Sequence, residues 1–504
     1  MAESIDRIER VADAVRRDGF TDVVLLGMGG SSLAPEVLRA VIGVAPGWPC
    51  FHMLDSTDPA AVAAVSPALS RTLFILASKS GTTIEPNSLA AHFEQQLERA
   101  GIARWAQQFV AITDEGTALA DRARAEGFRE TFINPSDIGG RYSALSFFGL
   151  VPAALMGQNI RALVDWARAM LELAESSPDP TTNPAVALGL AMAAGAQAGH
   201  DKLTLVSPPA LEPFGLWVEQ LVAESTGKEG VGVAPIAGET PDRVESYSSD
   251  RLFVRLALDN RADDRLDVAD LKAGHRPVIE IDLAEPLSLG AEFIRWEIAT
   301  AIAGALLRIN PFDEPNVQQA KDATRKLLDQ YGSTGALPAP PPDRTLPARV
   351  TLTLTGAARR DLRGRGPDAL LTLVTDRDYF SLLAYLGPDP DMAEALQHLR
   401  MGVRDRTHAA TMCGYGPRYL HSTGQLHKGG PNTGVFVLIT ASPRADLPIP
   451  GEAFSFGTLE LAQALGDFAS LDATGRRALH VHLPEPDAKL IRVVGESLLA
   501  GRPR

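Results

Sequence analysis

The sequence predicts an α/β protein in which helices cover parallel sheets. Short apolar runs alternate with amphipathic helical stretches in three successive parts of the chain, and this alternation is typical of parallel strands joined by helical crossovers. A proline-rich segment separates the third part from the first two. A chain of 504 residues has room for about three domains of ordinary size.

The first part, residues 1–175, predicts one domain built on a parallel sheet. Its short apolar runs are expected to be strands, at 22–27, 50–55, 72–78 and 109–113. Helices are expected from Leu33 onwards, over 87–100, and through 140–170.

The second part, residues 176–334, repeats the pattern and predicts a second domain. Its expected strands are 202–208, 251–258 and 277–283, and its expected helices are 211–226, 291–307 and 313–331. Asp313 is expected to cap the last helix, because Pro315 then falls in the first turn, where a missing N–H is harmless.

The third part follows residues 335–348, where dense prolines favour an extended linker. Beyond this linker, residues 349–504 predict a further α/β unit. Its expected strands are 350–356, 370–376, 434–440 and 478–484.

Composition and charge disfavour several classes of protein. The chain has 48 Lys and Arg against 62 Asp and Glu, and a formal net charge of −14 disfavours a general nucleic-acid binder. No apolar stretch reaches the roughly 18 residues of a membrane helix, and the polar N-terminus is unlike a signal peptide. Two distant cysteines, Cys50 and Cys413, fit a reducing compartment. We therefore expect a cytoplasmic protein without membrane or nucleic-acid partners.

A glycine-rich loop, GMGGSS at 27–32, follows the first expected strand and opens a helix. Glycines let the backbone approach a ligand, and a helix N-terminus attracts anions. A dinucleotide fingerprint requires glycine at the position of Ser32, although Asp55 ends the next strand, where a ribose-binding acid would lie. The motif alone leaves three interpretations open: a ligand loop, a weak NAD site and a tight strand–helix turn.

A hydroxyl-rich loop, SKSGTTIEP at 78–86, also lies between a strand and a helix. Ser78, Ser80, Thr82 and Thr83 offer four hydroxyls, whereas an ordinary helix cap needs only one. Side-chain O–H and backbone N–H donors suit a phosphate group, and the dipole of the following helix adds to them. The loop therefore predicts a phosphate site.

Two charged residues lie in glycine-containing segments. Arg141 follows two glycines in DIGGRYSALS (137–146), and Glu224 lies near a helix end in EQLVAESTGKEG (219–230). On pattern alone, such an arginine is usually a surface residue or half of an ion pair, and such a glutamate is usually solvated. A catalytic interpretation of either residue needs further support.

A long polar loop near the C-terminus, YGPRYLHSTGQLHKGGPNTG (415–434), predicts a functional segment. His421 and His427 are six residues apart, which matches no standard zinc spacing. HExxH, EF-hand and Walker A motifs do not occur in the sequence. The sequence therefore predicts neither a metal site nor a cofactor.

Taken together, five segments resemble the phosphoglucose isomerase family, whose members are built from two sugar-isomerase (SIS) domains. They are GMGGSSLAP, SKSGTTIEP, GGRYS, AESTGKEG and INPFDEPNVQQAK, in the order of the family. The resemblance covers about 20–330 and is weakest over 235–290. It is closest to the isomerase half of bacterial transaldolase–phosphoglucose isomerase fusions, which share the HSTGQLHKGG loop and the third unit.

The resemblance implies an isomerase of glycolysis and gluconeogenesis that interconverts glucose-6-phosphate and fructose-6-phosphate through an enediol, without a metal. Glu224 would move a proton between C1 and C2, and Arg141 would stabilise the enediolate. His421 and Lys321 would open the sugar ring. The residues implied to bind substrate and phosphate are Gly30, Ser31, Ser78, Lys79, Ser80, Thr83 and Gln220.

Two features depart from the family pattern. The His421 segment follows the Glu and Lys segments instead of lying between them. Because this histidine usually comes from a partner subunit, action in cis, action in trans and a homodimer all stay open. No transaldolase barrel precedes residue 20, so we expect no transaldolase activity, although pairing with a separate transaldolase and descent from a fusion are compatible with the resemblance.

Three other functions stay open on the sequence. The same catalytic set would serve an isomerase that also accepts mannose-6-phosphate. SIS domains also act as sugar-phosphate sensors, although the joint presence of Arg141, Glu224 and Lys321 argues against a pure sensor. An NAD oxidoreductase is disfavoured by Ser32. The first two alternatives share the leading prediction of a small-molecule sugar phosphate as partner.

Overall fold

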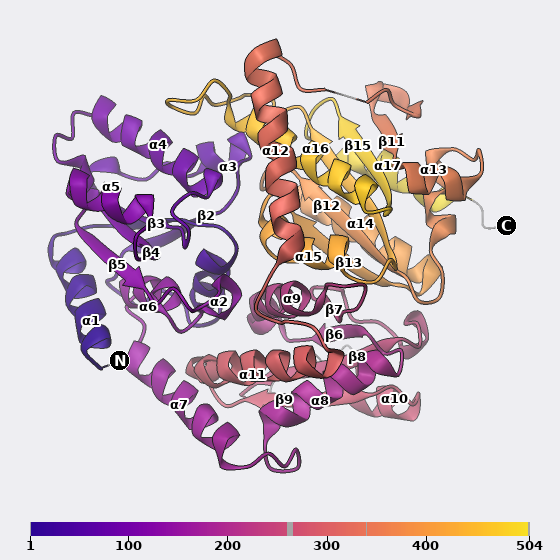
Figure 1. Ribbon diagram of the computed structural model, residues 1–504, viewed down its shortest axis with the longest axis horizontal. Helices are drawn as coiled ribbons and strands as arrows, with labels where there is room; N and C mark the ends of the chain where they lie inside the picture. The colour runs from indigo at the N-terminus through magenta and orange to yellow at the C-terminus, as the bar shows by residue number, and fades with distance from the viewer. Residues whose placement is uncertain (1, 260–265, 339, 502–504) are drawn as a thin grey trace.

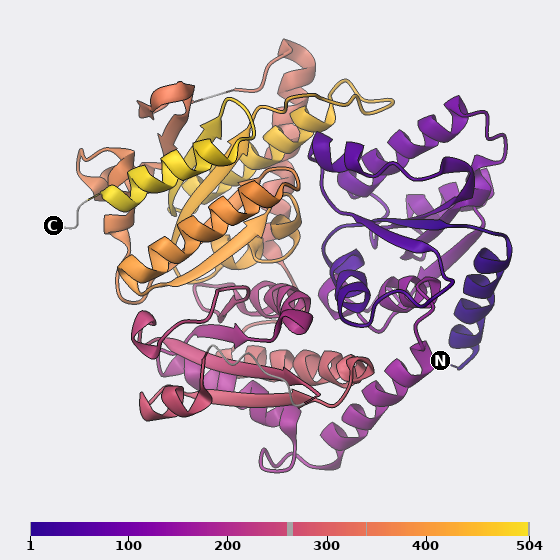
Figure 2. The ribbon, with the colours of Figure 1, turned by 180° about the vertical axis from the view of Figure 1, so that it is seen from behind.

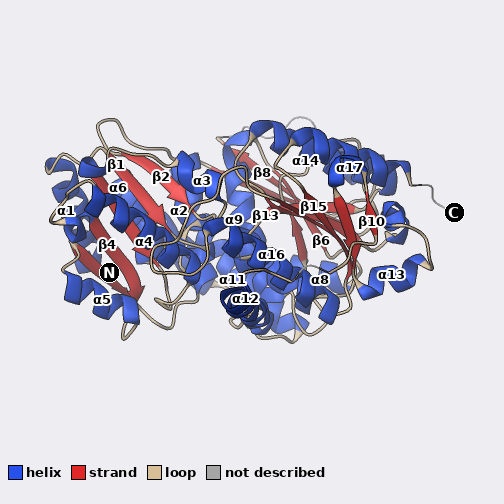
Figure 3. Cartoon of the chain, turned by 90° about the horizontal axis from the view of Figure 1, so that it is seen from above, coloured by secondary structure: helices blue, strands red, loops and turns tan. Residues whose placement is uncertain are grey.

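Three sheets flanked by helices make up the computed structural model, which describes residues 2–259, 266–338 and 340–501 (Figure 1). The first sheet lies on one side of the molecule, and the second and third lie together on the other side (Figures 2 and 3). The predicted α/β class, with parallel sheets covered by helices, is confirmed.

The first sheet is parallel throughout, in the order β2-β1-β3-β4-β5. Its strands are β1 (Asp22–Leu26), β2 (Cys50–Leu54), β3 (Thr72–Ala77), β4 (Phe109–Asp114) and β5 (Glu130–Asn134). Its helices are α1 (Ala2–Arg17), α2 (Leu33–Val41), α3 (Pro59–Ala64), α4 (Ile84–Arg99), α5 (Ala118–Glu126), α6 (Phe147–Leu155) and α7 (Ile160–Ser176). The four strands expected here are confirmed, because their continuous apolar runs suit strands that are covered on both faces.

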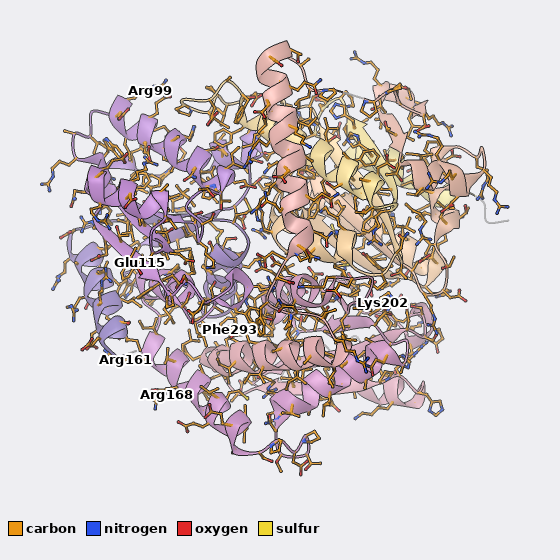
Figure 4. All side chains as sticks on the ribbon, viewed as in Figure 1. Arg99, Glu115, Arg161, Arg168, Lys202 and Phe293 are labelled. Carbon is orange, nitrogen blue, oxygen red and sulfur yellow. The ribbon has the colours of Figure 1, made fainter. Side chains whose placement is uncertain are left out.

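The second sheet is also parallel, in the order β7-β6-β8-β9. Its strands are β6 (Lys202–Val206), β7 (Ala234–Ile236), β8 (Arg251–Leu258) and β9 (Val278–Leu283), and its helices are α8 (Pro184–Gln197), α9 (Glu212–Thr226), α10 (Val268–Ala273) and α11 (Leu289–Leu307). Trp217 of α9 and Phe293 of α11 belong to an apolar core that also includes residues of the first sheet (Figure 4). The first two sheets therefore share one core.

The third sheet has the order β10-β11-β15-β14-β12-β13. Its strands are β10 (Arg344–Thr345), β11 (Thr351–Leu354), β12 (Tyr379–Tyr385), β13 (Ala410–Tyr415), β14 (Gly434–Ala441) and β15 (Arg477–Leu483). Its helices are α13 (Gly356–Leu362), α14 (Pro390–Thr407), α15 (Gly424–Gly429), α16 (Phe456–Ala473) and α17 (Ala488–Ala500). β12 to β15 pair in parallel, whereas β11 runs antiparallel to both of its neighbours.

Two local predictions are wrong. Residues 370–376 do not form a strand: a 3-10 helix covers Pro367–Leu373, because Pro367 fixes a helical start and the short leucine run packs into the core from one turn. The strands nearby are β12 and β13, which the sequence analysis missed. The cap of α12 (Pro315–Thr334) is also different, because Glu314 occupies the N-cap position and the Asp313 carboxylate accepts from Lys228.

α12 leads along the chain from the second unit to the third, and Figure 1 shows it standing between the first and third units. It packs along α16 and α15. Leu328 of α12 and Phe456 of α16 share an apolar cluster with Phe93 of α4. The third unit is therefore packed against the first, although the domain boundaries at 175, 334 and 348 stay predictions.

Ion pairs link α1 and α7 on the surface of the first unit. Arg161 of α7 forms ion pairs with Asp6 and Glu9 of α1, and Figure 4 shows Arg161 and Arg168 at the edge of the molecule. In the described ranges, no helix combines the length and apolar character that a membrane crossing needs.

Candidate active site

The candidate site lies at the carboxyl ends of the first sheet's strands, where the loops after β1 and β3 emerge. In the β1 loop, a side chain at Gly30 would collide with the backbone of Gly140. Gly29 has a φ of +56°, and a Cβ there would lie 2.8 Å from the Cβ of His421. These glycines therefore let three distant segments meet: the β1 loop, the Arg141 loop and the His421 loop.

The hydroxyl-rich loop between β3 and α4 borders a cavity of about 280 Å³. Ser80, Thr82 and Thr83 line this cavity. Ser78 is buried, and its hydroxyl donates to Thr83 Oγ1 at 3.1 Å, so it supports the loop from within the protein. The rest of the lining comes from α4, α12, α16 and the loop that carries His421.

Two other residues expected at the substrate lie elsewhere. The ammonium group of Lys79 pairs with Asp114 and donates to the carbonyl oxygen of Ser136 at 2.9 Å. Lys79 is not among the residues that line the cavity. Ser31 is buried at the end of the turn after β1. The structure thus brings the loop hydroxyls to the cavity, but not the Lys79 ammonium.

Glu224 lies near the end of α9, and 7% of the residue is exposed. One turn earlier, Gln220 Nε2 donates to Glu224 Oε2 at 3.3 Å. Burial raises the pKa of Glu224 above the ordinary value, while the charge of Arg141 partly offsets this and that of Glu314 adds to it. Such a carboxylate is a stronger base than an exposed glutamate.

Arg141 is almost completely buried, and several acceptors fix its guanidinium group. Nε donates to Ser225 Oγ at 2.8 Å, Nη1 to Glu314 Oε2 at 2.9 Å, and Nη2 to the Pro311 carbonyl at 2.7 Å. Nη1 also lies 3.5 Å from Glu224 Oε1. A fixed positive charge therefore lies beside the candidate base, where it can stabilise a developing anion.

Gln220 connects the candidate base to the third unit. Its Nε2 donates to the carbonyl oxygen of His421 at 2.7 Å and also faces Glu224. Its Oε1 is buried and has no hydrogen-bond partner in the described part of the chain. The second and third units therefore meet at the site within one chain.

His421 lies in the loop between β13 and α15, and its ring is held by a carboxylate of the first unit. Its Nε2 lies 3.1 Å from Glu85 Oε1. The same oxygen accepts from Gln463 Nε2 at 2.7 Å, and Gln463 Oε1 accepts from the Thr57 hydroxyl at 2.9 Å. Burial raises the pKa of Glu85. The charge of His421 and the hydrogen bond between the two side chains outweigh this effect, so the pKa of Glu85 lies below its ordinary value.

Lys321 lies on α12 and lines the same cavity as His421. Its charge contributes to the lowered pKa of Glu85, after the larger effects of burial and of His421. The four residues expected to be catalytic therefore gather around one region, from all three units of the chain.

Other motif residues have structural partners. Asp55 pairs with Arg418 through two hydrogen bonds, both of 2.7 Å, so each carboxylate oxygen already has a partner within the protein. This pair ties the His421 loop to the first unit. The ring nitrogens of His427 are buried, without partners in the ranges that the structure describes, and desolvation lowers its pKa well below the usual range. No cluster of three or more His, Cys, Asp or Glu suited to a metal ion occurs in those ranges.

Known proteins are similar to this chain. The profile of the phosphoglucose isomerase family matches residues 13–234. A glucose-6-phosphate isomerase from Cyanothece sp. is 32% identical over 380 residues, which cover 65% of this chain and 71% of the relative. The chain belongs to the phosphoglucose isomerase family. It is a sugar-phosphate isomerase of the aldose–ketose class.

A further relative and two solved structures are also similar to this chain. A chloroplastic glucose-6-phosphate isomerase from Arabidopsis thaliana is 29% identical over 356 residues, 61% of this chain and 57% of the relative. A hypothetical protein from Thermus thermophilus superposes with a TM-score of 0.57 at 26% identity, covering 64% of this chain and 87% of its own. A Chlamydia trachomatis glucose-6-phosphate isomerase shares the fold, with a TM-score of 0.54 at 22% identity over 65% of this chain and 73% of its own.

Three residues of this candidate site were missed by the sequence analysis: Glu85, Glu314 and Gln463. Glu85 stands within SKSGTTIEP, but an acidic residue in the first turn of a helix is ordinary, because it complements the helix dipole. Gln463 lies in an amphipathic helix without any motif. Only the packing of α16 against α4 brings its amide to Glu85.

Proposed function

We propose that this chain interconverts glucose-6-phosphate and fructose-6-phosphate. The observation that carries the proposal is the buried Glu224 carboxylate, 3.5 Å from the fixed guanidinium of Arg141 and linked through Gln220 to the loop of His421. Aldose–ketose isomerisation needs a base for a carbon-bound proton and a cation for the oxyanion that develops. Glu224 and Arg141 supply these two groups.

In the proposed reaction, Glu224 removes the C2 proton of the open-chain aldose. The electron pair of the broken C–H bond enters the C1–C2 bond, and the carbonyl oxygen at C1 gains the negative charge of an enediolate, which Arg141 stabilises. The proton of the C2 hydroxyl passes to the C1 oxygen, Glu224 returns the carbon-bound proton to C1, and C2 becomes the carbonyl carbon of the ketose. The raised pKa of Glu224 favours this role, since a catalytic base works best when its pKa approaches the working pH. The proposal assigns no step to a metal.

Ring opening is assigned to His421, with Lys321 as the second group. In the neutral tautomer that donates its Nε2 proton to the Glu85 carboxylate, the imidazole of His421 keeps its lone pair on Nδ1. Nδ1 can then take the proton of the C1 hydroxyl while the ring oxygen gains one. Because His421 lies in the same chain as Glu224, this step needs no partner subunit.

The phosphate group is assigned to the loop at 78–83. Ser80 and Thr83 face the cavity, and the first backbone N–H groups of α4 follow them directly. Gln220, which the family resemblance places at the phosphate, contacts Glu224 and the His421 carbonyl, and we assign it to holding these two segments together. A grip on the remote phosphate supplies binding energy for orientation of the reacting carbons.

The test is conversion of fructose-6-phosphate by wild type and by Glu224→Gln. We expect Glu224→Gln to bind substrate and to lose at least about 10²-fold in kcat, the usual scale for a general base. It should also lose deuterium exchange from solvent at C2. The matched control is Glu219→Gln, which changes another buried glutamate of α9 outside this network.

The same assay separates the alternatives. A variant that keeps both turnover and exchange removes Glu224 from the mechanism. Binding of fructose-6-phosphate without turnover by wild type would favour a sugar-phosphate sensor. Conversion of mannose-6-phosphate alongside glucose-6-phosphate would identify the broader isomerase.

The relation to transaldolase–isomerase fusions is part of this proposal. The HSTGQLHKGG loop and a third unit after the two SIS domains support it. A homodimer is compatible with the proposal, and measurement of the molecular mass in solution tests it.

A further inference from the structure

The phosphate loop offers hydroxyls to the cavity but no cation. A phosphate monoester carries a charge of about −1.5 to −2 at pH 7. Lys79 is the only cation within 78–86, and its ammonium group pairs with Asp114. Neutral donors alone leave most of the phosphate charge uncompensated in a partly desolvated cavity. A cation from another element would add the charge compensation that these donors lack.

α12 presents two cations to this cavity. Lys321 and Arg325 are four residues apart, so they share one face of the helix, and both line the cavity with Ser80 and Thr83. Within the described ranges, neither side chain forms an ion pair or a hydrogen bond. Like charges at this spacing destabilise a helix. In a chain with a net charge of −14, two unpaired cations on one cavity indicate an anionic ligand.

We propose that Arg325 binds the substrate phosphate together with the hydroxyls of Ser80 and Thr83. This inference rests on the proposed function and names a binding residue that no motif indicates. A planar guanidinium can give a phosphate two parallel hydrogen bonds, whereas an ammonium group acts as a point charge.

The two cations have separate tasks. Lys321 lies close enough to Glu85 for its charge to act on that carboxylate, which holds the ring-opening His421. Arg325 lies four residues further along α12, about 6 Å away along the helix axis. We therefore assign Lys321 to the opening of the sugar ring and Arg325 to binding of the phosphate.

Inorganic phosphate is the probe. Its binding is measured by calorimetry without substrate, and by competition against fructose-6-phosphate. Arg325→Gln is compared with wild type and with Lys326→Gln, which removes a neighbouring exposed charge that does not line the cavity. Circular dichroism checks that both variants are folded.

We expect Arg325→Gln to weaken phosphate binding about tenfold, the scale of one lost hydrogen bond to a charged group. The KM for fructose-6-phosphate should rise by a similar factor, with kcat within about twofold of wild type, because the contact is equal in ground and transition states. Lys326→Gln should change neither quantity, and Arg325→Lys should restore part of the binding.

Wild-type phosphate affinity in Arg325→Gln overturns the inference. Equal weakening by Arg325→Gln and Lys326→Gln also overturns it, because that result would reflect net charge alone. The double variant Ser80→Ala with Thr83→Ala tests the loop separately from Arg325. If only this variant loses phosphate binding, the assignment of the phosphate to the loop stands and its assignment to Arg325 is withdrawn. If wild type binds phosphate through Arg325 but lacks isomerase activity, the proposed function fails and this contact stands.

Discussion

Replacing Glu85 by glutamine removes the charge that holds His421 while keeping the shape of the side chain. In the structure, Glu85 Oε1 accepts from both His421 Nε2 at 3.1 Å and Gln463 Nε2 at 2.7 Å. The His421 and Glu85 side chains are 15% and 4% exposed, so water screens their interaction little. A hydrogen bond to a charged group contributes about 1.5–3 kcal/mol. At about 1.4 kcal/mol per factor of ten, the expected loss of rate is about 10-fold to 150-fold.

The loss should depend on the form of the substrate. Glucose-6-phosphate is mostly cyclic and requires ring opening, whereas a four-carbon sugar phosphate cannot close the same ring. We expect Glu85→Gln to lose about 10-fold to 150-fold in kcat/KM on glucose-6-phosphate and to remain within about threefold of wild type on the four-carbon substrate, followed by proton exchange in deuterated water. Glu94→Gln is the matched control, since Glu94 lies on the same helix and pairs with Arg122 instead.

An equal loss on both substrates would refute the reasoning, because Glu85 would then support the isomerisation step or the fold instead of ring opening. Full activity on the cyclic substrate would refute it as well. In that case the contact between Glu85 and His421 only braces the loop, and the assignment of His421 to ring opening must be withdrawn.

Two further predictions follow from the site and its surroundings. Ser80→Ala with Thr83→Ala should raise the KM for fructose-6-phosphate at least about tenfold in steady-state assays, because donors to a charged group are lost; an unchanged KM would move the phosphate away from this loop. Burial raises the pKa of Glu219 from 4.5 to about 7, so the folded chain holds a proton that the unfolded chain releases. Wild type should therefore lose up to about 3 kcal/mol of unfolding free energy as the pH rises from about 4.5 to 7. Glu219→Gln should lack this loss. Urea denaturation of wild type and Glu219→Gln at pH 4 and pH 8 measures the difference, and identical pH profiles of their unfolding free energies would contradict the assignment.

Much of the first two units follows from local pattern. The continuous apolar runs at 22–27 and 72–78 predict buried parallel strands, and β1 and β3 occupy them. The glycine and hydroxyl motifs that follow these strands must then lie at the same edge of the sheet. This placement needs only the parallel order of neighbouring strands, so the position of the hydroxyl-rich loop could be predicted from the sequence.

Local pattern fails where an apolar run has no clear period. The run at 370–376 shows no clear alternation of apolar and polar residues, and it is shorter than a typical helix. The proline before it favours the start of a 3-10 helix. β12 and β13 are fully formed nearby, but the sequence analysis passed over both. Packing against the third unit's core decides between a strand and a helix for such a run. A window of seven residues contains no information on that packing.

The sequence by itself determined the α/β class, the position of the glycine-rich and hydroxyl-rich loops after strands, and the presence of residue types suited to proton transfer, because these depend on neighbours a few residues apart. The tertiary structure decided which groups act on one another. His421 meets Glu85 across 336 residues, and the Lys79 ammonium is taken by Asp114 while Arg325 is left facing the cavity. The raised pKa of Glu224 also depends on burial against segments distant in the chain. Desolvation and ion pairing act through space, so no pattern along the chain can fix them.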